Sequence, residues 1–508
     1  MWPRHTGDFS VFRVYAAADG TTPADYSPEN VPYRAPVHLT VSAKGYKDGD
    51  FTMIMGFPGT TTRYMTTYEI DEMLDVANPN RILIRGERQK ILKEDMEASD
   101  RVRIQYSDKY ANSSNYWKNS IGKSKAVRKL GIRDRRQEQE AAFTRWAQAD
   151  PARSEYLRAL PLIAASKEVS VPLESDRQVL REAIVSSVEV ASIAAVLSRA
   201  LPDLLSAEPL AAEETIAAVY KDYNEPTDRK VAKRMIELTM EMVSPDNMPE
   251  FITTEVEGRF GGDVQAYVDW LYDNSIYANR EKLESYLAGG GELPADDPAL
   301  TVFNTTVAKH NGLVEQLREP AMQFAEGHKL YIKGLLEMDA DGKHYPDANF
   351  TIRLTYGNVK SYSPADAVDY DYFTTLTGVM EKEDELNPTE FTVPEKLKEL
   401  YIEQDYGPYA DLSGLTRKEI RNGAKGHVNT CFISTNDITG GNSGSPVLND
   451  RGQLIGLAFD GNWDAMSGDV LFEPELQRCI NVDVRYVLFV IDKFAGAGHL
   501  LDEMTIEW

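Results

Sequence analysis

The chain has 508 residues, with 80 acidic and 55 basic side chains, and its formal net charge at pH 7 is −25. This negative charge argues against nucleic-acid binding, because the phosphate backbone would be repelled. Hydrophobic residues make up 42% of the chain, but no run approaches the ~20 apolar residues of a membrane-spanning helix, so we expect no membrane insertion.

Three blocks of different character follow one another along the chain. Residues 1–62 predict β structure, with strands at 9–15, 37–42 and 51–56. Residues 63–342 carry apolar side chains at helical spacing, for example in 123–149, 177–205, 210–223, 229–243 and 261–287. Residues 343–508 return to β character, with strands expected at 350–356, 391–393, 428–434 and 447–459 and a closing helix at 484–494. A chain of this length is too long for one core, so we predict a helical domain inserted between two β portions.

Residues 440–446 give the strongest functional signal in the sequence. They read Gly-Gly-Asn-Ser-Gly-Ser-Pro between two apolar runs, a pattern of strand, tight turn and strand. A serine on such a turn presents its hydroxyl outward, and the flanking glycines let backbone N–H groups form an oxyanion hole. The pattern is close to the nucleophile loop of chymotrypsin-like peptidases, with Ser443 as nucleophile and the amides of Gly441 and Ser443 as donors. An ordinary hairpin is the alternative, because Gly, Asn and Ser dominate turns.

Asp8 stands at the start of the first predicted strand. In chymotrypsin-like enzymes the acid of the catalytic triad has a similar place and orients the histidine; a turn or strand-edge aspartate is the alternative. The chain order in that fold is His, Asp, Ser, yet only His5 precedes Asp8, and none of the seven histidines has a setting typical of the base. We therefore expect the catalytic histidine to lie in an earlier part of a longer protein, and these 508 residues to be nearly inactive alone.

Six long blocks extend the comparison over the whole chain. They are MWPRHTGDFSVFRVY (1–15), MGFPGTT (55–61), ANSSNYWKNSIGK (111–123), GGNSGSPVLN (440–449), FDGNWDAMSGD (459–469) and NVDVRYVLFVIDKFAGA (481–497). With these blocks the chain resembles the bacterial serine dipeptidyl-peptidases of peptidase family 46, which include dipeptidyl-peptidases seven and eleven.

The resemblance implies both a fold and an activity. The fold is a chymotrypsin-like double β-barrel with a large inserted all-α domain: the remainder of the first barrel at 1–62, the helical lid at 63–342, and the second barrel with its terminal helix at 343–508. The implied activity is removal of dipeptides from the free N-termini of oligopeptides, without metal or cofactor. The resemblance also implies a homodimer and a full-length protein that is periplasmic or secreted.

Three further residues receive a substrate role from the resemblance. Asp460 matches the position that binds the α-amino group, a cation best held by a carboxylate, and Asn115 resembles the residue that completes this anchor from the helical domain. Gly461 stands where members that prefer acidic P1 residues have an arginine, so the resemblance implies a hydrophobic P1 preference. A turn aspartate, a helix-cap asparagine and a turn glycine are the respective alternatives. A catalytically inactive peptide-binding protein that retains the anchor is the second functional hypothesis.

The cysteine pattern leaves two possibilities open. Cys431 and Cys479 are the only cysteines, and their spacing is not typical of a metal site. They would form a disulfide in an exported protein or remain as two buried thiols.

Overall fold

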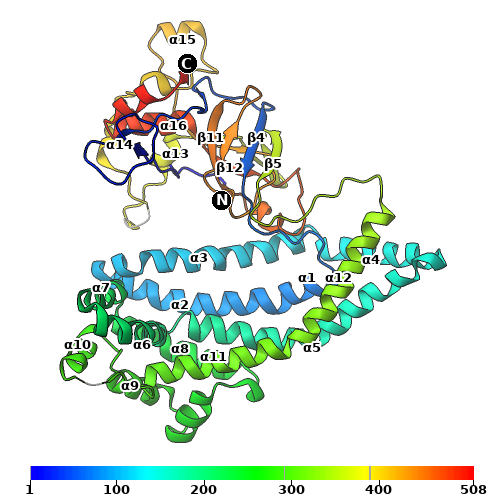
Figure 1. Ribbon diagram of the computed structural model, residues 1–508. Helices are drawn as coiled ribbons and strands as arrows, with labels where there is room; N and C mark the ends of the chain where they lie inside the picture. Colours follow the sequence, from blue (N-terminus) through cyan, green and yellow to red (C-terminus); the bar gives the residue numbers. More distant parts are fainter. Residues whose placement is uncertain (1, 291, 388–390) are drawn as a thin grey trace. The chain divides into compact units, whose positions relative to one another are not determined.

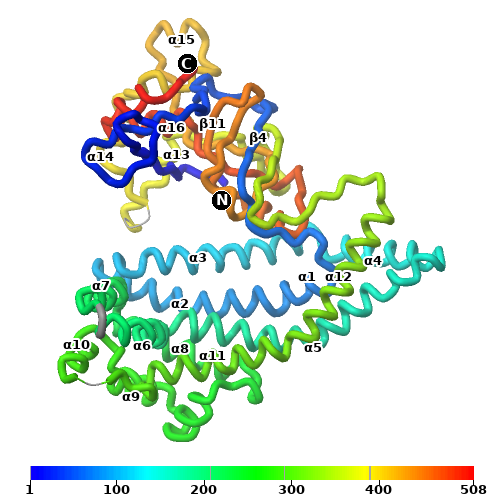
Figure 2. Tube along the Cα trace, in the orientation of Figure 1, coloured from blue at the N-terminus to red at the C-terminus, as the bar shows by residue number. Residues whose placement is uncertain are grey.

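The structure is a computed structural model that describes residues 2–290, 292–387 and 391–508. It contains two compact units: unit 1 consists of Met1–Arg63 and Tyr345–Trp508, and unit 2 of Tyr64–His344. The chain leaves unit 1 after Arg63 and returns to it at Tyr345 (Figure 2). The described strands all belong to unit 1, whereas unit 2 is built from helices, so the fold mixes α and β structure as predicted (Figure 1).

One sheet organises unit 1, with the strand order β5-β4-β10-β11-β12-β9-β8 and a short parallel extension by β3 and β13 beside β11. The strands of unit 1 are β1 (Tyr15–Ala16), β2 (Val31–Pro32), β3 (Val41–Ser42), β4 (Phe51–Gly56), β5 (Arg353–Asn358), β6 (Tyr362–Ala365), β7 (Val368–Tyr370), β8 (Phe373–Thr375), β9 (Asn429–Ser434), β10 (Pro446–Leu448), β11 (Leu454–Gly461), β12 (Cys479–Asp483) and β13 (Ile506–Glu507), of which β1 with β2 and β6 with β7 form separate two-stranded sheets. Its helices and helical turns are α13 (Leu376–Glu381), α14 (Glu395–Ile402), η6 (Gly407–Tyr409), α15 (Arg417–Arg421), η7 (Asp464–Ser467), α16 (Val484–Phe489), η8 (Val490–Phe494) and η9 (Gly498–Glu503).

The main sheet of unit 1 closes on itself. Directly after β5, Val359 forms a bridge with Ser434 at the end of β9. The N–H of Lys360 donates to the carbonyl of Ile433 (3.3 Å). Phe432 and Val447 are fully buried in one apolar cluster. The strands from β5 to β9 therefore form a ring, and a second cluster with residues of α16 and η8 covers part of the sheet.

Unit 2 is a helical assembly with its own core. Its elements are α1 (Thr67–Glu72), η1 (Met73–Ala77), α2 (Asn78–Ala98), α3 (Asp100–Lys129), α4 (Ile132–Gln148), η2 (Pro151–Arg158), α5 (Ala159–Val179), η3 (Leu180–Val185), α6 (Glu189–Ala207), α7 (Pro209–Tyr220), α8 (Glu225–Met242), η4 (Pro245–Asn247), η5 (Ile252–Arg259), α9 (Val264–Asn274), α10 (Arg280–Ala288), α11 (Pro298–Gln316) and α12 (Arg318–Met338). The largest apolar cluster joins α6, α8, α9 and α11, with Leu197 and Ile236 fully buried in it.

Local sequence sets the breaks between these helices. Gly131 has a positive φ of 58° and separates α3 from α4, which divides the helical segment predicted at 123–149. α2 and α3 lie side by side (Figure 1), and small polar residues line their contact. Asn78 donates to Ser124 (2.9 Å) and Gln89 donates to Ser113 (3.2 Å), so buried amides find partners between the two helices.

Several predicted strands differ from the structure: the one at 37–42 is reduced to Val41–Ser42, and the one at 447–459 is a hairpin of β10 and β11. Residues 9–14 pair with no other strand in the described part of the chain, and the strand begins only at Tyr15. Residues 391–393 form a loop. Alternating apolar residues favour a strand, but a strand also needs a hydrogen-bonding neighbour, which the sequence pattern does not supply. By contrast, the strands at 51–56 and 428–434 and the closing helix at 484–494 are confirmed.

The cysteines are two separate buried thiols. On the ladder between β9 and β12, Cys431 lies opposite Val482 and Cys479 lies opposite Ser434. Because side chains alternate along a strand, the two sulfur atoms point to opposite faces of the sheet. Burial raises the pKa of Cys431 to about 12, so this thiol is unreactive at neutral pH.

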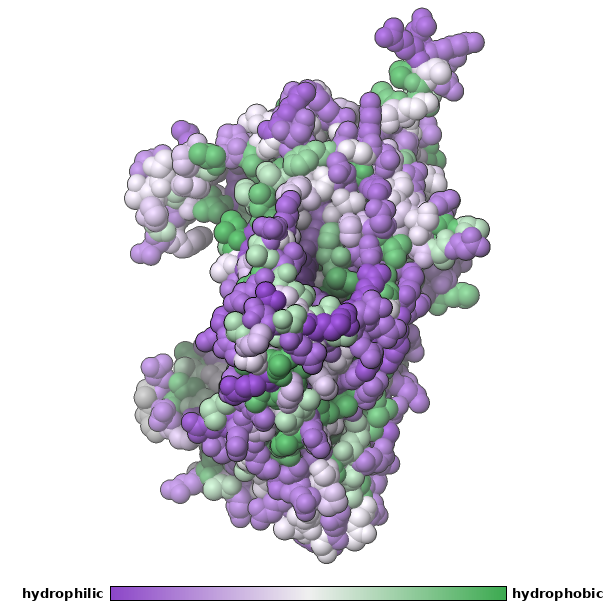
Figure 3. Space-filling view, turned by 90° about the vertical axis from the view of Figure 1, so that its right-hand side faces the viewer, coloured by the Kyte–Doolittle hydropathy of each residue, from purple (hydrophilic) through white to green (hydrophobic). Residues whose placement is uncertain are grey.

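The face in Figure 3 is mainly hydrophilic, with apolar side chains in small scattered groups. Among the described residues no single helix is long and apolar enough to cross a membrane. Pro151–Val185 and Glu189–Leu205 meet the length and composition requirements only as a pair, which is bent by 79°.

Candidate active site

Ser443 lies in the turn between β9 and β10, which we call the serine loop (residues 437–445). Gly441 has a φ of +105° and Gly444 a φ of +84°, so both glycines adopt backbone conformations that other residues rarely reach. A Cβ on Gly441 would also collide with the carbonyl oxygen of Phe57. Ser443 itself is exposed, and its hydroxyl makes one long hydrogen bond, to the carbonyl of Phe459 (3.5 Å).

The amides of the serine loop fall into two groups. The N–H of Asn442 donates to Thr439 (3.1 Å) and the N–H of Gly444 donates to Ala458 of β11 (2.7 Å). The N–H groups of Gly441 and Ser443 donate to no acceptor among the described residues. Two unused amide donors beside an exposed serine are what an oxyanion hole needs.

Asp8 and the histidines do not complete a triad in the described part of the chain. Asp8 is exposed and forms no hydrogen bond or ion pair there, and no histidine hydrogen-bonds to Ser443. His5 packs against Gly378 in α13. Burial, aided by the charge of Lys382, lowers the pKa of His5 to about 4, so its ring is neutral at pH 7.

Asp460 lies on β11 beside a bulge that interrupts the pairing with β12. Its Oδ1 accepts the N–H of Gly461 (2.8 Å), and its Oδ2 lies 3.1 Å from Nη1 of Arg4. The Arg4 guanidinium also lies over the ring of Phe459, 5.3 Å from its centroid. The sequence analysis did not find Arg4, because nothing in the pattern around it indicates a partner more than 450 residues away.

Gly461 is buried, and a Cβ placed on it would lie 2.9 Å from the Cβ of Ala465. The nearby Arg478 is 1% exposed and donates only to backbone carbonyls among the described residues, namely those of Lys360, Ser361, Pro474, Glu475 and Gln477. Its guanidinium therefore has no carboxylate partner there, and its donors are engaged within unit 1.

Asn115 belongs to α3 of unit 2 and is exposed, and its side chain makes no hydrogen bond among the described residues. It lies in the middle of the helix, so it is not a helix cap. Its neighbour Tyr116 carries the Arg85 guanidinium over its ring, 4.9 Å from the centroid. The Asn115 side chain is thus available, on the surface of unit 2, to bind a ligand.

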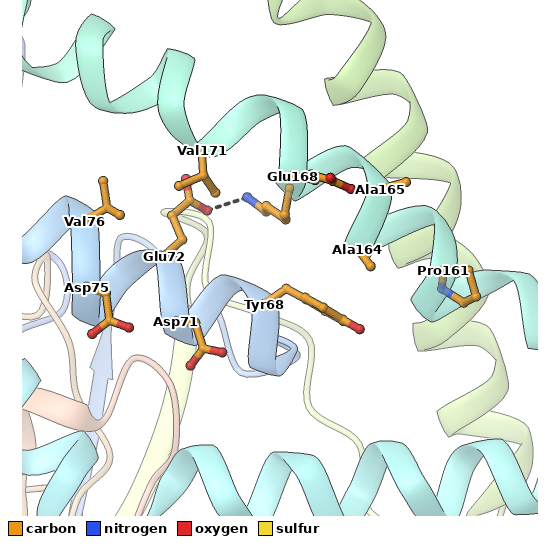
Figure 4. Close-up of a pocket in the computed structure, with 11 residues that line it drawn as sticks. Tyr68, Asp71, Glu72, Asp75, Val76, Pro161, Ala164, Ala165, Glu168 and Val171 are labelled. Atoms are coloured by element: carbon orange, nitrogen blue, oxygen red, sulfur yellow. Dashed lines mark hydrogen bonds and ion pairs between the residues drawn. The ribbon is translucent and has the colours of Figure 1, made fainter. Parts of the chain in front are cut away.

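A large hollow of about 760 Å³ lies within unit 2, between α1 and η1 on one side and α5 on the other (Figure 4). Three of its four acidic side chains form ion pairs, Glu72 with Lys167 (2.6 Å), Asp71 with Arg133 (2.6 Å) and Asp75 with Arg128 (3.8 Å), whereas Glu168 forms none among the described residues. Its walls carry no serine, cysteine or histidine. The hollow therefore offers no serine or cysteine nucleophile and no histidine base, and we place the candidate active site at the serine loop instead.

Known proteins match almost the whole length of this chain. Residues 1–506 match the model of the family described as Peptidase S46. "Dipeptidyl-peptidase 7" of Phocaeicola vulgatus is 47% identical over the whole chain, which spans 69% of that protein. "Asp/Glu-specific dipeptidyl-peptidase" of Porphyromonas gingivalis is 39% identical, again over the whole chain and 69% of the relative.

Solved structures of similar sequence have the same fold as this chain. The crystal structure of Porphyromonas endodontalis DPP11 in complex with the dipeptide Arg-Glu is similar to this chain with a TM-score of 0.87 and 35% sequence identity. The similarity covers 100% of this chain and 71% of that one. Sequence and fold thus agree, and the chain belongs to the peptidase S46 family.

Proposed function

We propose that the protein is a serine dipeptidyl-peptidase that releases dipeptides from the free N-termini of oligopeptides. The observation that carries the proposal is the serine loop. There the Ser443 side chain is exposed, and the backbone N–H groups of Gly441 and Ser443 donate to no acceptor among the described residues. Relatives named dipeptidyl-peptidase support the choice of reaction.

The chemistry follows from these groups. The Ser443 oxygen attacks the carbonyl carbon of the second substrate residue while a histidine base takes its proton, and the amides of Gly441 and Ser443 hold the negative oxygen. The proton then passes to the amide nitrogen, the C–N bond breaks, and water hydrolyses the acyl-enzyme. In this proposal Asp8 orients the histidine.

The same proposal gives unit 1 and unit 2 distinct roles. The ring from β5 to β9 corresponds to the second barrel of a chymotrypsin-like enzyme, residues 1–62 to the remainder of the first, and unit 2 to a lid that admits only chain ends. A homodimer in the periplasm or outside the cell completes the proposal.

For the substrate amine we propose Asp460 as anchor, supported by Asn115. An α-amino group with a pKa near 8 is mostly cationic at neutral pH and gains from a charge-assisted hydrogen bond. In unit 1 the Asp460 carboxylate already bonds Arg4 (3.1 Å), so the amine shares this carboxylate or displaces the guanidinium.

For P1 we propose a hydrophobic preference. Gly461 brings no charge, and the guanidinium of Arg478, whose backbone carbonyl lies close to Gly461, is engaged with carbonyl groups. Neither position 461 nor Arg478 would thus offer a guanidinium to an acidic P1 residue. Relatives named dipeptidyl-peptidase 7 and relatives named Asp/Glu-specific dipeptidyl-peptidase both match this chain. The preference for the P1 side chain is therefore the property to measure.

The deciding experiment compares one peptide with a free and with an acetylated N-terminus, in the natural protein that contains this chain. We expect kcat/KM to fall roughly 10- to 100-fold on acetylation, the worth of a charge-assisted hydrogen bond. In D460N the two peptides should become nearly equal. Equal turnover of both peptides by the unmodified protein would remove the anchor. Binding of the free peptide without any cleavage would instead favour a catalytically inactive peptide-binding protein.

A further inference from the structure

The two chain segments that connect the units are joined to each other inside unit 1. We call this joint the clasp (residues 57–63 and 345–350). Thr60 bridges Asn349, and the N–H of Phe350 donates to the carbonyl of Pro58 (2.9 Å). Asp347 accepts both the hydroxyl of Thr61 (2.6 Å) and the N–H of Arg63 (2.8 Å). The segment that leaves unit 1 and the segment that returns are therefore held by the same hydrogen bonds.

The clasp also holds the serine loop. The N–H of Gly59 donates to the carbonyl of Gly440 (2.6 Å), one residue before the glycine with a φ of +105°. The N–H of Thr62 donates to the carbonyl of Asp469 (2.7 Å), and the carboxylate of Asp469 accepts the hydroxyl of Thr439 (2.5 Å). The clasp thus contacts the serine loop directly at Gly440 and, through Asp469, at Thr439.

Arg63, the last residue before unit 2, makes the strongest of these contacts. Its Nη1 and Nη2 donate to the two carboxylate oxygens of Asp437 (2.6 and 2.7 Å), and its Nε and Nη2 donate to the carbonyl of Gly468 (3.2 and 3.1 Å). Both partners of the ion pair are about three-quarters buried, at 25% and 27% exposed. A planar fork that binds two oxygens at once fixes direction as well as distance.

We propose that Arg63 is a positioning residue for Ser443: it fixes Asp437, six residues before the nucleophile, and so holds the serine loop in the conformation that presents the hydroxyl and the amides of Gly441 and Ser443. The role of Ser443 rests on the proposed function, but the loop conformation does not. A contact that merely anchored the linker would leave the loop unchanged on its removal. Arg353 provides the comparison, because it bonds the carbonyl of Asp347 (3.1 Å) in the same clasp but not the serine loop.

Amide hydrogen exchange of the 508-residue chain tests the proposal without any need for catalysis. In R63Q we expect the hydrogen-bonded amides of the serine loop (Asp437, Asn442, Gly444 and Ser445) to exchange at least about tenfold faster than in the unmodified chain, while β12 exchanges as before. R63K, which keeps the charge but loses the fork, should fall between the two, and R353Q should leave the loop unchanged. D437N, which keeps Arg63, should loosen the loop as R63Q does, and it replaces R63Q if that variant fails to fold.

Kinetics in the natural protein give the second measurement. R63Q should lower kcat at least about tenfold with KM within about twofold, because the substrate contacts remain. Guanidinium ion at millimolar concentration should restore part of the rate. Loop exchange in R63Q equal to that in R353Q would overturn the proposal. A protein that cleaves no peptide while R63Q still loosens the loop would contradict the proposed function and leave the positioning role of Arg63 supported.

Discussion

Gly461 is the residue at which specificity can be tested most directly. Its amide is held by Asp460 (2.8 Å), and a Cβ at this position would already lie 2.9 Å from Ala465. The backbone at Gly461 is therefore fixed by the same carboxylate that we propose for the substrate amine. A larger residue here has to displace η7, the turn that carries Ala465.

We predict that G461R changes P1 preference from leucine or phenylalanine toward aspartate and glutamate. The guanidinium fills the space next to P1 and offers two parallel donors to a carboxylate, while apolar side chains leave it unpaired. The ratio of kcat/KM for substrates that differ only at P1 should change by roughly 100-fold or more. G461A is the matched control, because it has the same contact with Ala465 but no charge. If G461R stays active with an unchanged ratio, Gly461 does not line the P1 site.

Asp228 links two helices of unit 2 through a buried carboxylate. It lies on α8, is 1% exposed, and accepts the N–H groups of Glu189 and Val190 at the start of α6 (both 2.8 Å). The hydroxyl of Tyr272 also donates to it (2.7 Å). Burial, together with the charge of Glu189, raises the pKa of Asp228 to about 7.

This raised pKa predicts how the stability of unit 2 depends on pH. An unfolded aspartate titrates near pH 4, so between about pH 4 and 7 the folded state binds more protons, and the free energy of unfolding falls as pH rises. The D228N variant lacks this titrating group. Between about pH 4 and 7 its free energy of unfolding should therefore fall by less than that of the unmodified chain, by on the order of 1–3 kcal/mol.

Thermal unfolding of both proteins at several pH values between about 5 and 8 measures the effect. D263N is the control, because Asp263 also caps a helix (α9, through the N–H of Ala266 at 3.0 Å) but is exposed. It should keep the original pH dependence. Parallel curves for D228N and the unmodified chain would show that Asp228 stays ionised when buried.

Sequence patterns correctly predicted the elements that are determined by residues close together in the sequence. The strand at 51–56 and the turn with Ser443 follow from alternation and from glycines in the left-handed region. The segment 9–14 was wrongly predicted as a strand, because pairing depends on a neighbour elsewhere. β12 was missed, because it is buried throughout and does not alternate. Arg4 and Arg63 were missed for the same physical reason: their partners are distant in sequence, and a lone arginine carries no signal.

For the whole molecule, we predict that residues 1–508 alone hydrolyse dipeptide substrates only at a trace level. Without a histidine bonded to Ser443, the hydroxyl keeps its proton, which costs roughly 10⁴-fold or more in rate. Purified chain should therefore match its S443A variant in a chromogenic assay. Robust turnover that disappears in S443A would reveal a base that the described hydrogen bonds do not include, with His5 as the first residue to replace.

Thr60 and Asn349 lie opposite each other, so residues 64–344 leave unit 1 and return at one point. The entropy cost of closing a loop grows only with the logarithm of its length, by about 0.6 kcal/mol per doubling. Unit 1 therefore tolerates an insertion of almost any size there, provided that the two ends of the insertion meet. The helical half can diverge in sequence and length during evolution while the half that carries Ser443 keeps its geometry.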